Sequence, residues 1–210
     1  MLLLARNLFL ASLILFYKSE KNNLTFTVHH TCSIEGGKEL VLKNAPFLSE
    51  YRPLEDKKPF LGEGYYFWEY NLDYAKVWGR YHYSNKYFIV ESNVYIDHER
   101  ENYYLDLVGN RKHLVFFVRL LTKFNLLNKI GTKGIDLCFI IDYLRKTIPE
   151  AFPFKVIRAV DYKNKDREGI KIQFNDKGNS FTILNPRFIF SFKNKEDIVY
   201  LEKPFITFTS

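Results

Sequence analysis

The chain has 210 residues, enough for one domain with a sizeable core, and its 47% hydrophobic and 18% aromatic residues exclude a disordered or low-complexity protein. The formal net charge of +7 is compatible with an acidic partner such as a nucleotide or a nucleic acid, although basic and acidic residues are interspersed along the chain. Two cysteines and five histidines without metal-ligand spacing indicate a reducing compartment and no structural metal, so we expect a cytoplasmic protein.

The first 23 residues contain an apolar run from Leu8 to Tyr17, flanked by Arg6 and Lys18. Its ten residues are too few for a membrane-spanning helix, which needs about 20. No small-residue cleavage site follows the run, as a secretory signal would require. We expect residues 1–23 to form an apolar helix packed on the domain; a targeting or interfacial segment and an unrepresentative start are the alternatives. Residues 24–210 are expected to form the domain itself.

Hydrophobic periodicity and turn residues predict the order of the remaining elements. The first strand, 24–28, is expected to end at a polar tip made of His29, His30 and Thr31. Asn175-Asp176-Lys177-Gly178 predicts a hairpin turn between two late strands. Further strands are expected at 87–96, 103–107, 154–160, 170–174, 181–184 and 188–192, and helices at 34–41, from Asn71 through Tyr81, 113–127 and 135–144. This order predicts a single α+β domain with a central helical insert.

The stretch between residues 61 and 79 places Gly62 and Gly64 directly before four aromatic residues. A glycine at the start of a strand marks a bulge, a positive φ angle or the close approach of another group. The two glycines therefore indicate either a loop that enters an ordinary strand or a backbone that lies beside a flat ligand. In the helix that follows, Trp78 is expected on the inner face. Glu63 and Glu69, which come before this helix, are expected to be solvated.

The order of these motifs resembles the ADP-ribosyltransferase superfamily. A strand with His29-His30-Thr31 comes first, then a Gly62-x-Gly64-Tyr65-Tyr66-Phe67 strand, then a helix that carries Ala75. The similarity is greatest to the H-Y-E, poly(ADP-ribose)-polymerase-like branch and to compact bacterial transferase domains. It covers residues 24–80 by motif and the rest by order of elements. The resemblance implies a mostly antiparallel split sheet and NAD as co-substrate.

The resemblance also implies roles for individual residues. His29 and Thr31 would bond the ribose hydroxyls, the backbone at His30 would hold the carboxamide, and Tyr66 would stack on nicotinamide. Gly64, Tyr65 and Trp78 would complete the cofactor site. Cleavage of NAD passes through an oxocarbenium-like state, so the enzyme needs a rigid grip on both ends of the breaking bond. His30 stands where the family keeps a glycine, which is a departure from the pattern.

The family's third motif, a glutamate on a late strand, has no match in three trial registers. These registers place Gln173, Ser180 or Ile189 at the acid position. Gln173 is preferred, because an amide accepts a hydrogen bond from a ribose hydroxyl, and Glu168 is an alternative that would reach the site from a loop. The missing acid argues against chain elongation.

These observations favour an NAD-dependent mono-ADP-ribosyltransferase-like protein, a toxin or defence effector that modifies a protein or a nucleic acid. Its expected partners are NAD, a macromolecular acceptor and an antitoxin or inhibitor, with no stable membrane span. A catalytically inactive NAD-binding protein and a basic nucleic-acid-binding protein are the alternatives. Arg187 either pairs with a phosphate of the dinucleotide or lies at the surface.

Overall fold

The computed structural model describes residues 24–52, 54, 57–98, 100, 102–129, 135–161, 171–174 and 181–210. The apolar segment 1–23, the turn 175–178, Glu168 and Ser180 lie outside the described residues, so the structure does not test the predictions made for them. Within the described part, no helix is both long and apolar enough to cross a membrane.

The predicted α+β class is confirmed. The elements, in chain order, are β1 (Leu24–Ser33), α2 (Gly37–Asn44), β2 (Leu48–Ser49), β3 (Gly64–Glu69), α3 (Leu72–Tyr83), β4 (Tyr87–Ile96), β5 (Tyr104–Asp106), α4 (Arg111–Lys123), η2 (Leu127–Lys129), α5 (Leu137–Thr147), β6 (Val156–Val160), β7 (Lys171–Gln173), β8 (Phe181–Ile183), β9 (Phe188–Phe192), η3 (Lys195–Asp197), β10 (Val199–Tyr200) and β11 (Phe205–Thr209).

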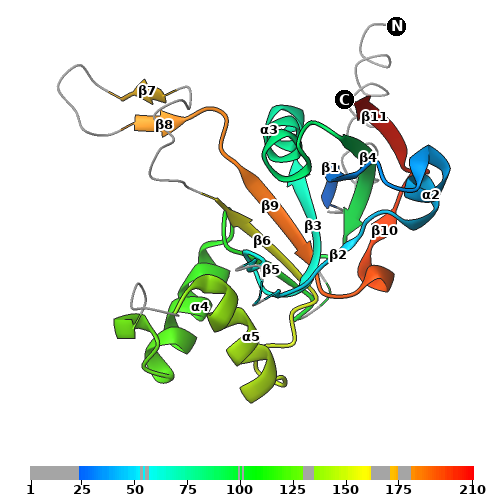
Figure 1. Ribbon diagram of the computed structural model, residues 1–210. Coiled ribbons are helices and arrows are strands. Elements are labelled where there is room, and N and C mark those ends of the chain that lie inside the picture. The colour runs from blue at the N-terminus through cyan, green and yellow to red at the C-terminus, as the bar shows by residue number, and fades with distance from the viewer. Residues whose placement is uncertain are drawn as a thin grey trace, which may run out of the picture.

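Nine of the strands form one sheet with the order β10-β4-β1-β3-β9-β6-β5, to which β11 adds at β4 and β2 adds at β3 (Figure 1). The β5–β6 pairing is parallel, and the other pairings between the described strands are antiparallel. Strands β7 and β8 form a separate two-stranded sheet that stands away from the main sheet in Figure 1. The sheet is therefore mixed but mostly antiparallel, as expected.

Strand β1 is longer than its sequence predicts. It pairs with β4 at all ten positions from Leu24 to Ser33, so His29, His30 and Thr31 lie inside a strand and not at a polar tip. The prediction was wrong because polar residues usually end a strand, whereas here each of the three side chains bonds to a neighbouring element. The Nδ1 of His29 is buried and has no hydrogen-bond partner among the described residues.

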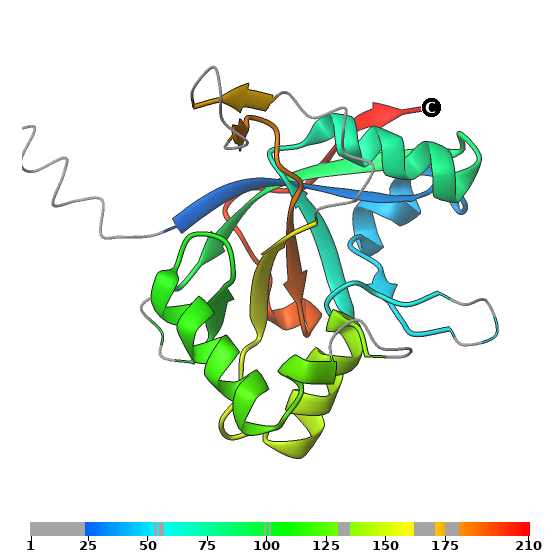
Figure 2. The same ribbon diagram turned by 90° about the vertical axis from the view of Figure 1, so that its left-hand side faces the viewer.

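The two faces of the sheet are covered by different helices. Residues directly opposite each other on paired strands share a face, so His29, Trp68 and Ile189 lie on one face, and Val28, Phe67 and Phe190 lie on the other. The first face packs on α3 near β1 and β4, and on α4 and α5 near β5 and β6. Figures 1 and 2 show α3 and the α4–α5 pair at opposite ends of the sheet. The second face packs on α2 and on the segment before β10.

Helix α3 begins as predicted, because the Asn71 side chain accepts a hydrogen bond from the Tyr74 N–H. Its buried residues are Ala75 and Gly79, and a β-carbon at Gly79 would collide with the ring of Tyr87. Trp78 is 37% exposed, so the prediction that it lies in the core was wrong. The small residues Ala75 and Gly79 allow α3 to approach the sheet closely, which leaves the larger side chains at the flanks of the helix.

Glu69, at the end of β3, was also predicted wrongly as a solvated residue. It is 9% exposed, and Arg158 of β6 donates two hydrogen bonds to its carboxylate at 2.6 and 2.7 Å. This bidentate pair joins β3 to β6 across the intervening strand β9.

Candidate functional site

His29 of β1 points to the face of the sheet that carries α3. Its Nε2 lies 3.2 Å from the Oε2 of Glu91, the residue directly opposite on β4. His29 is 5% exposed, whereas the Glu91 side chain is 26% exposed. Burial lowers the pKa of His29, and the neighbouring Glu91 carboxylate partly opposes this shift. The pair thus consists of a buried imidazole and a carboxylate that reaches solvent.

The sequence alone did not identify Glu91. It is a lone acid within a strand of otherwise apolar and neutral residues, YFIVESNVYI, and this is the signal that could have found it. A carboxylate on a half-buried strand needs a partner, but only the β1–β4 register shows that the partner is His29.

His30 points to the opposite face and is buried. Its Nδ1 lies 2.9 Å from the carbonyl oxygen of Tyr66, and its Nε2 accepts a hydrogen bond from the Phe47 N–H at 3.1 Å. A neutral imidazole with the proton on Nδ1 satisfies both contacts. Burial lowers the pKa of His30 to about 4. The side chain that replaces the family's glycine therefore joins β1, β3 and the segment before β2.

Thr31 connects strand β1 to helix α3. Its Oγ1 donates a hydrogen bond to the Ala75 carbonyl at 3.0 Å, and the threonine is 7% exposed. The hydroxyl that the resemblance assigns to a ribose contact is thus already used within the chain.

Tyr66 lies on the same face as His29, but its hydroxyl is also occupied. It donates to the Gly62 carbonyl at 2.5 Å and accepts from the Leu61 N–H at 2.6 Å. The ring packs against the core formed with α4 and α5, and burial raises the pKa of its phenol. Tyr65, next to it, is partly buried against the core of the other face.

The two glycines of the motif have a structural explanation. Gly62 has a φ of 78°, a left-handed conformation that favours glycine. A β-carbon on Gly64 would lie 2.7 Å from both the Phe192 carbonyl oxygen and the Ser191 Oγ of β9. Close packing of the chain on itself therefore accounts for both glycines without a ligand.

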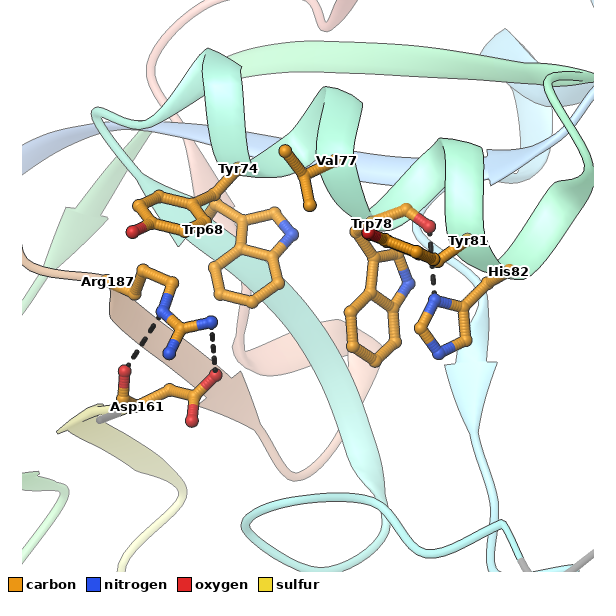
Figure 3. A pocket seen from close by; sticks show the side chains of 8 residues that line it. All are labelled: Trp68, Tyr74, Val77, Trp78, Tyr81, His82, Asp161 and Arg187. Atoms are coloured by element: carbon orange, nitrogen blue, oxygen red, sulfur yellow. Dashed lines mark hydrogen bonds and ion pairs between the residues drawn. The ribbon is translucent and has the colours of Figure 1, made fainter. Parts of the chain in front are cut away.

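An aromatic cleft opens between α3 and the ends of β3, β6 and β9 (Figure 3). Its volume is about 80 Å³, well below the roughly 300–1,000 Å³ of pockets that enclose a drug-sized molecule. The Trp68 ring lies 6.3 Å from Tyr74 and 5.8 Å from Trp78, and His82 stacks on Trp78 at 3.7 Å. The residues that line the cleft are Trp68, Tyr74, Val77, Trp78, Tyr81, His82, Asp161 and Arg187.

Arg187 forms the charged end of this cleft. Its Nε donates to the Asp161 carbonyl at 3.1 Å, and one terminal nitrogen lies 3.5 Å from the Asp161 carboxylate. The guanidinium also lies 4.9 Å from the centre of the Tyr74 ring. With 6% exposure, Arg187 is a buried and oriented cation and not a surface residue.

Two of the residues proposed for the third motif, Gln173 and Ile189, lie within the described part of the chain, and neither faces this region as a ligand-binding group. Gln173 is exposed on β7, in the two-stranded sheet that stands apart from β1 and β3 (Figure 1). Ile189 is buried opposite Trp68.

A second groove, of about 550 Å³, lies between α5 and the segment that precedes β3. Its walls mix aromatic rings with charges of both signs, and Lys58 and Asp136 form an ion pair of 3.4 Å there. The lining residues are Tyr51, Lys58, Asp136, Cys138, Phe139, Asp142, Tyr143, Lys146 and Thr147.

In the part of the chain that the structure describes, no group of three or more His, Cys, Asp or Glu could hold a metal ion. No family model, curated protein or solved structure matches the chain. A functional assignment therefore depends on the residues and their geometry.

Proposed function

We propose that the protein is an NAD-dependent mono-ADP-ribosyltransferase whose donor site lies at the aromatic cleft. The supporting observation is one row of side chains across three neighbouring strands. Trp68 of β3 lies opposite His29 of β1, and His29 lies opposite Glu91 of β4. Neighbouring strands are about 4.8 Å apart, so the row extends from the cleft to the carboxylate within roughly 10 Å.

The cleft suits the flat nicotinamide ring of NAD. Trp68 and Tyr74 offer aromatic faces, and such rings bind flat and cationic groups by stacking and cation–π attraction. With a volume of about 80 Å³ the cleft holds one ring, so the rest of the dinucleotide would cross the surface.

In the proposed reaction, the bond between the nicotinamide nitrogen and ribose C1′ breaks, and nicotinamide leaves as a neutral molecule. An acceptor oxygen or nitrogen forms the new bond to C1′ and loses one proton. Glu91 is the group proposed to stabilise the positive charge on the ribose and to accept this proton. His29 is proposed to position Glu91, because it is buried and bonded to that carboxylate.

The test is release of nicotinamide, and transfer of label, when the pure protein is incubated with labelled NAD and cell extract. Because both tryptophans of the chain line the cleft, their fluorescence reports NAD binding directly. Glu91→Gln should retain NAD binding and lose at least about tenfold in turnover. Glu63→Gln is the matched control and should match the wild type. Absence of both turnover and a fluorescence change would reject the proposal.

Binding of NAD without turnover is the second candidate function. It is favoured by the hydroxyls of Thr31 and Tyr66, which the chain itself already occupies. Calorimetry that detects NAD binding, together with an assay that detects no nicotinamide, would support this candidate; any turnover that Glu91→Gln abolishes would exclude it.

A further inference from the structure

Most of helix α3, which lines the proposed site, lies in a stretch of the chain without acidic residues. Between Asp73 and Glu91 there is no Asp or Glu, whereas Lys76, Arg80 and Lys86 supply three positive charges. Aromatic residues are interleaved with these charges along the whole stretch. Over most of the chain acidic and basic residues are mixed, but residues 74–90 carry only positive charges.

The outer surface of α3 presents several of these side chains to solvent. Tyr81 is 82% exposed, and its helix neighbours Arg80 and His82 are also exposed. Lys86, in the connection between α3 and β4, is exposed as well. The helix is held to the sheet by Ala75 and Gly79 on its other side, so packing of the domain does not require Tyr81. We call Arg80, Tyr81 and His82 at the end of α3, together with Lys86 just after the helix, the α3 outer surface.

His82 is held as a flat platform at this surface. One face of its ring stacks on Trp78 with an angle of 14° between the planes, and its Nδ1 lies 3.1 Å from the Trp78 carbonyl oxygen. Figure 3 shows His82 and Tyr81 projecting from α3 next to the cleft. An oriented ring and a second exposed ring, with exposed cations close to them in the chain, are features with which proteins bind unpaired bases.

We propose that the α3 outer surface binds a single-stranded nucleic acid. Bases stack on Tyr81 and on the outward face of His82, while Arg80 and Lys86 contact phosphates. An unpaired strand is required, because the bases of a duplex are stacked on each other and are not available to side chains. The absence of acids from Tyr74 to Val90 favours this polyanion over a protein partner.

This surface deepens the proposed function, because it names the acceptor of the ADP-ribose. Only the role of the nucleic acid as acceptor rests on the proposed function, because the binding of the strand itself needs no NAD. Tyr81 and His82 also line the cleft proposed for NAD, so a strand bound to them would lie beside the reacting ribose.

The experiment measures the fluorescence anisotropy of labelled oligo(dT) and oligo(U), each of about 12 nucleotides, between about 50 and 200 mM salt. For two phosphate contacts, the logarithm of the association constant should fall with the logarithm of the salt concentration with a slope of about −1.4. Arg80→Ala should reduce this slope by about 0.7. Tyr81→Ala should weaken binding about tenfold and leave the slope unchanged.

Two control variants lie elsewhere on the surface. Lys112→Ala on α4 removes the same charge as Arg80→Ala, and Tyr51→Ala removes another exposed tyrosine. Both should bind like the wild type. A preference for oligo(U) over oligo(dT) would identify RNA as the ligand, and the reverse would identify DNA; either result supports the proposal.

Three results would overturn it: no binding of either oligonucleotide at about 50 mM salt, equal losses in Lys112→Ala and Arg80→Ala, or tighter binding of a duplex of the same sequence. NAD turnover without oligonucleotide binding would reject this inference alone. Oligonucleotide binding without NAD turnover would reject the proposed function and leave the surface in place.

Discussion

His29 and His30 are neighbours in the sequence, yet the structure gives them opposite surroundings. His29 lies on the α3 face, next to a carboxylate that reaches solvent, whereas His30 lies on the other face between a backbone carbonyl and a backbone N–H. The period of two along a strand separates the pair completely. Within the motif His29-His30-Thr31, His29 is therefore a candidate functional residue, whereas His30 has a structural role.

His30→Ala should have the largest effect on stability. It removes a buried ring and leaves the Tyr66 carbonyl and the Phe47 N–H without their partner. We expect the free energy of unfolding to fall by about 3–5 kcal/mol, measured by urea denaturation followed by circular dichroism. His29→Ala should cost about 1–2 kcal/mol, because its partner Glu91 can be hydrated. Equal losses in the two variants would mean that the two histidines do not differ as described.

The second prediction is a loss of stability in acid that depends on His30. Its pKa is about 4 in the folded protein and about 6.5 in the unfolded chain, so the unfolded state binds the proton first as the pH falls. Stability should therefore be complete above pH of about 6.5 and should fall by about 1.4 kcal/mol per pH unit toward pH of about 4. Urea denaturation at pH values of about 7, 6 and 5 measures this slope.

The matched variant for this experiment is His30→Asn, which removes the titrating ring and keeps an N–H for the Tyr66 carbonyl. The free energy of unfolding of this variant should fall less steeply with decreasing pH than that of the wild type. The difference should be the contribution of one histidine, about 1.4 kcal/mol per pH unit. Burial also lowers the pKa values of His29 and His113, so part of the slope should remain. An unchanged slope in His30→Asn would refute the assignment of this loss to His30.

Tyr66 connects the surroundings of the two histidines, because its carbonyl bonds to His30 and its ring lies on the face of His29. Tyr66→Phe should lower the free energy of unfolding by about 1–2 kcal/mol, since the Leu61 N–H and the Gly62 carbonyl lose their partner. NAD binding should be unchanged if the cleft at Trp68 is the donor site. Tyr81→Phe is the control for loss of a hydroxyl and should leave stability unchanged. Loss of NAD binding in Tyr66→Phe would instead support a donor site that contains the Tyr66 hydroxyl.

The sequence predicted the class of the fold and several elements well. The strands Tyr87–Ile96 and Phe188–Phe192 have the predicted bounds, because each is a run of β-branched and aromatic residues with clear ends. The Asn71 cap was identified for a similar local reason. Where local preference and burial agree, the sequence is informative.

The parts that were missed depend on contacts between distant residues. The length of β1 follows from its pairing with β4, the exposure of Trp78 follows from the close packing of Gly79 on Tyr87, and the burial of Glu69 follows from Arg158. For the candidate site, the sequence motifs lie on β1 and β3. The carboxylate at Glu91 and the cleft at Trp68 required the register between strands.

The smallest expected change in stability, and the most direct view of His29, comes from Glu91→Gln. The carboxylate raises the pKa of His29 against the effect of burial, so its replacement by a neutral amide should lower that pKa further. The free energy of unfolding at neutral pH should change by less than about 1 kcal/mol, because the Glu91 side chain is partly hydrated and an amide can still accept a hydrogen bond from Nε2. Titration of the imidazole nitrogens by NMR measures the pKa, with His113 as the internal control because it lies beside Asp106 and not Glu91. A lowered pKa for His29 alone would establish the electrostatic coupling that the proposed mechanism needs, and an unchanged pKa would leave Glu91 as an ordinary surface acid and His29 as a second structural histidine.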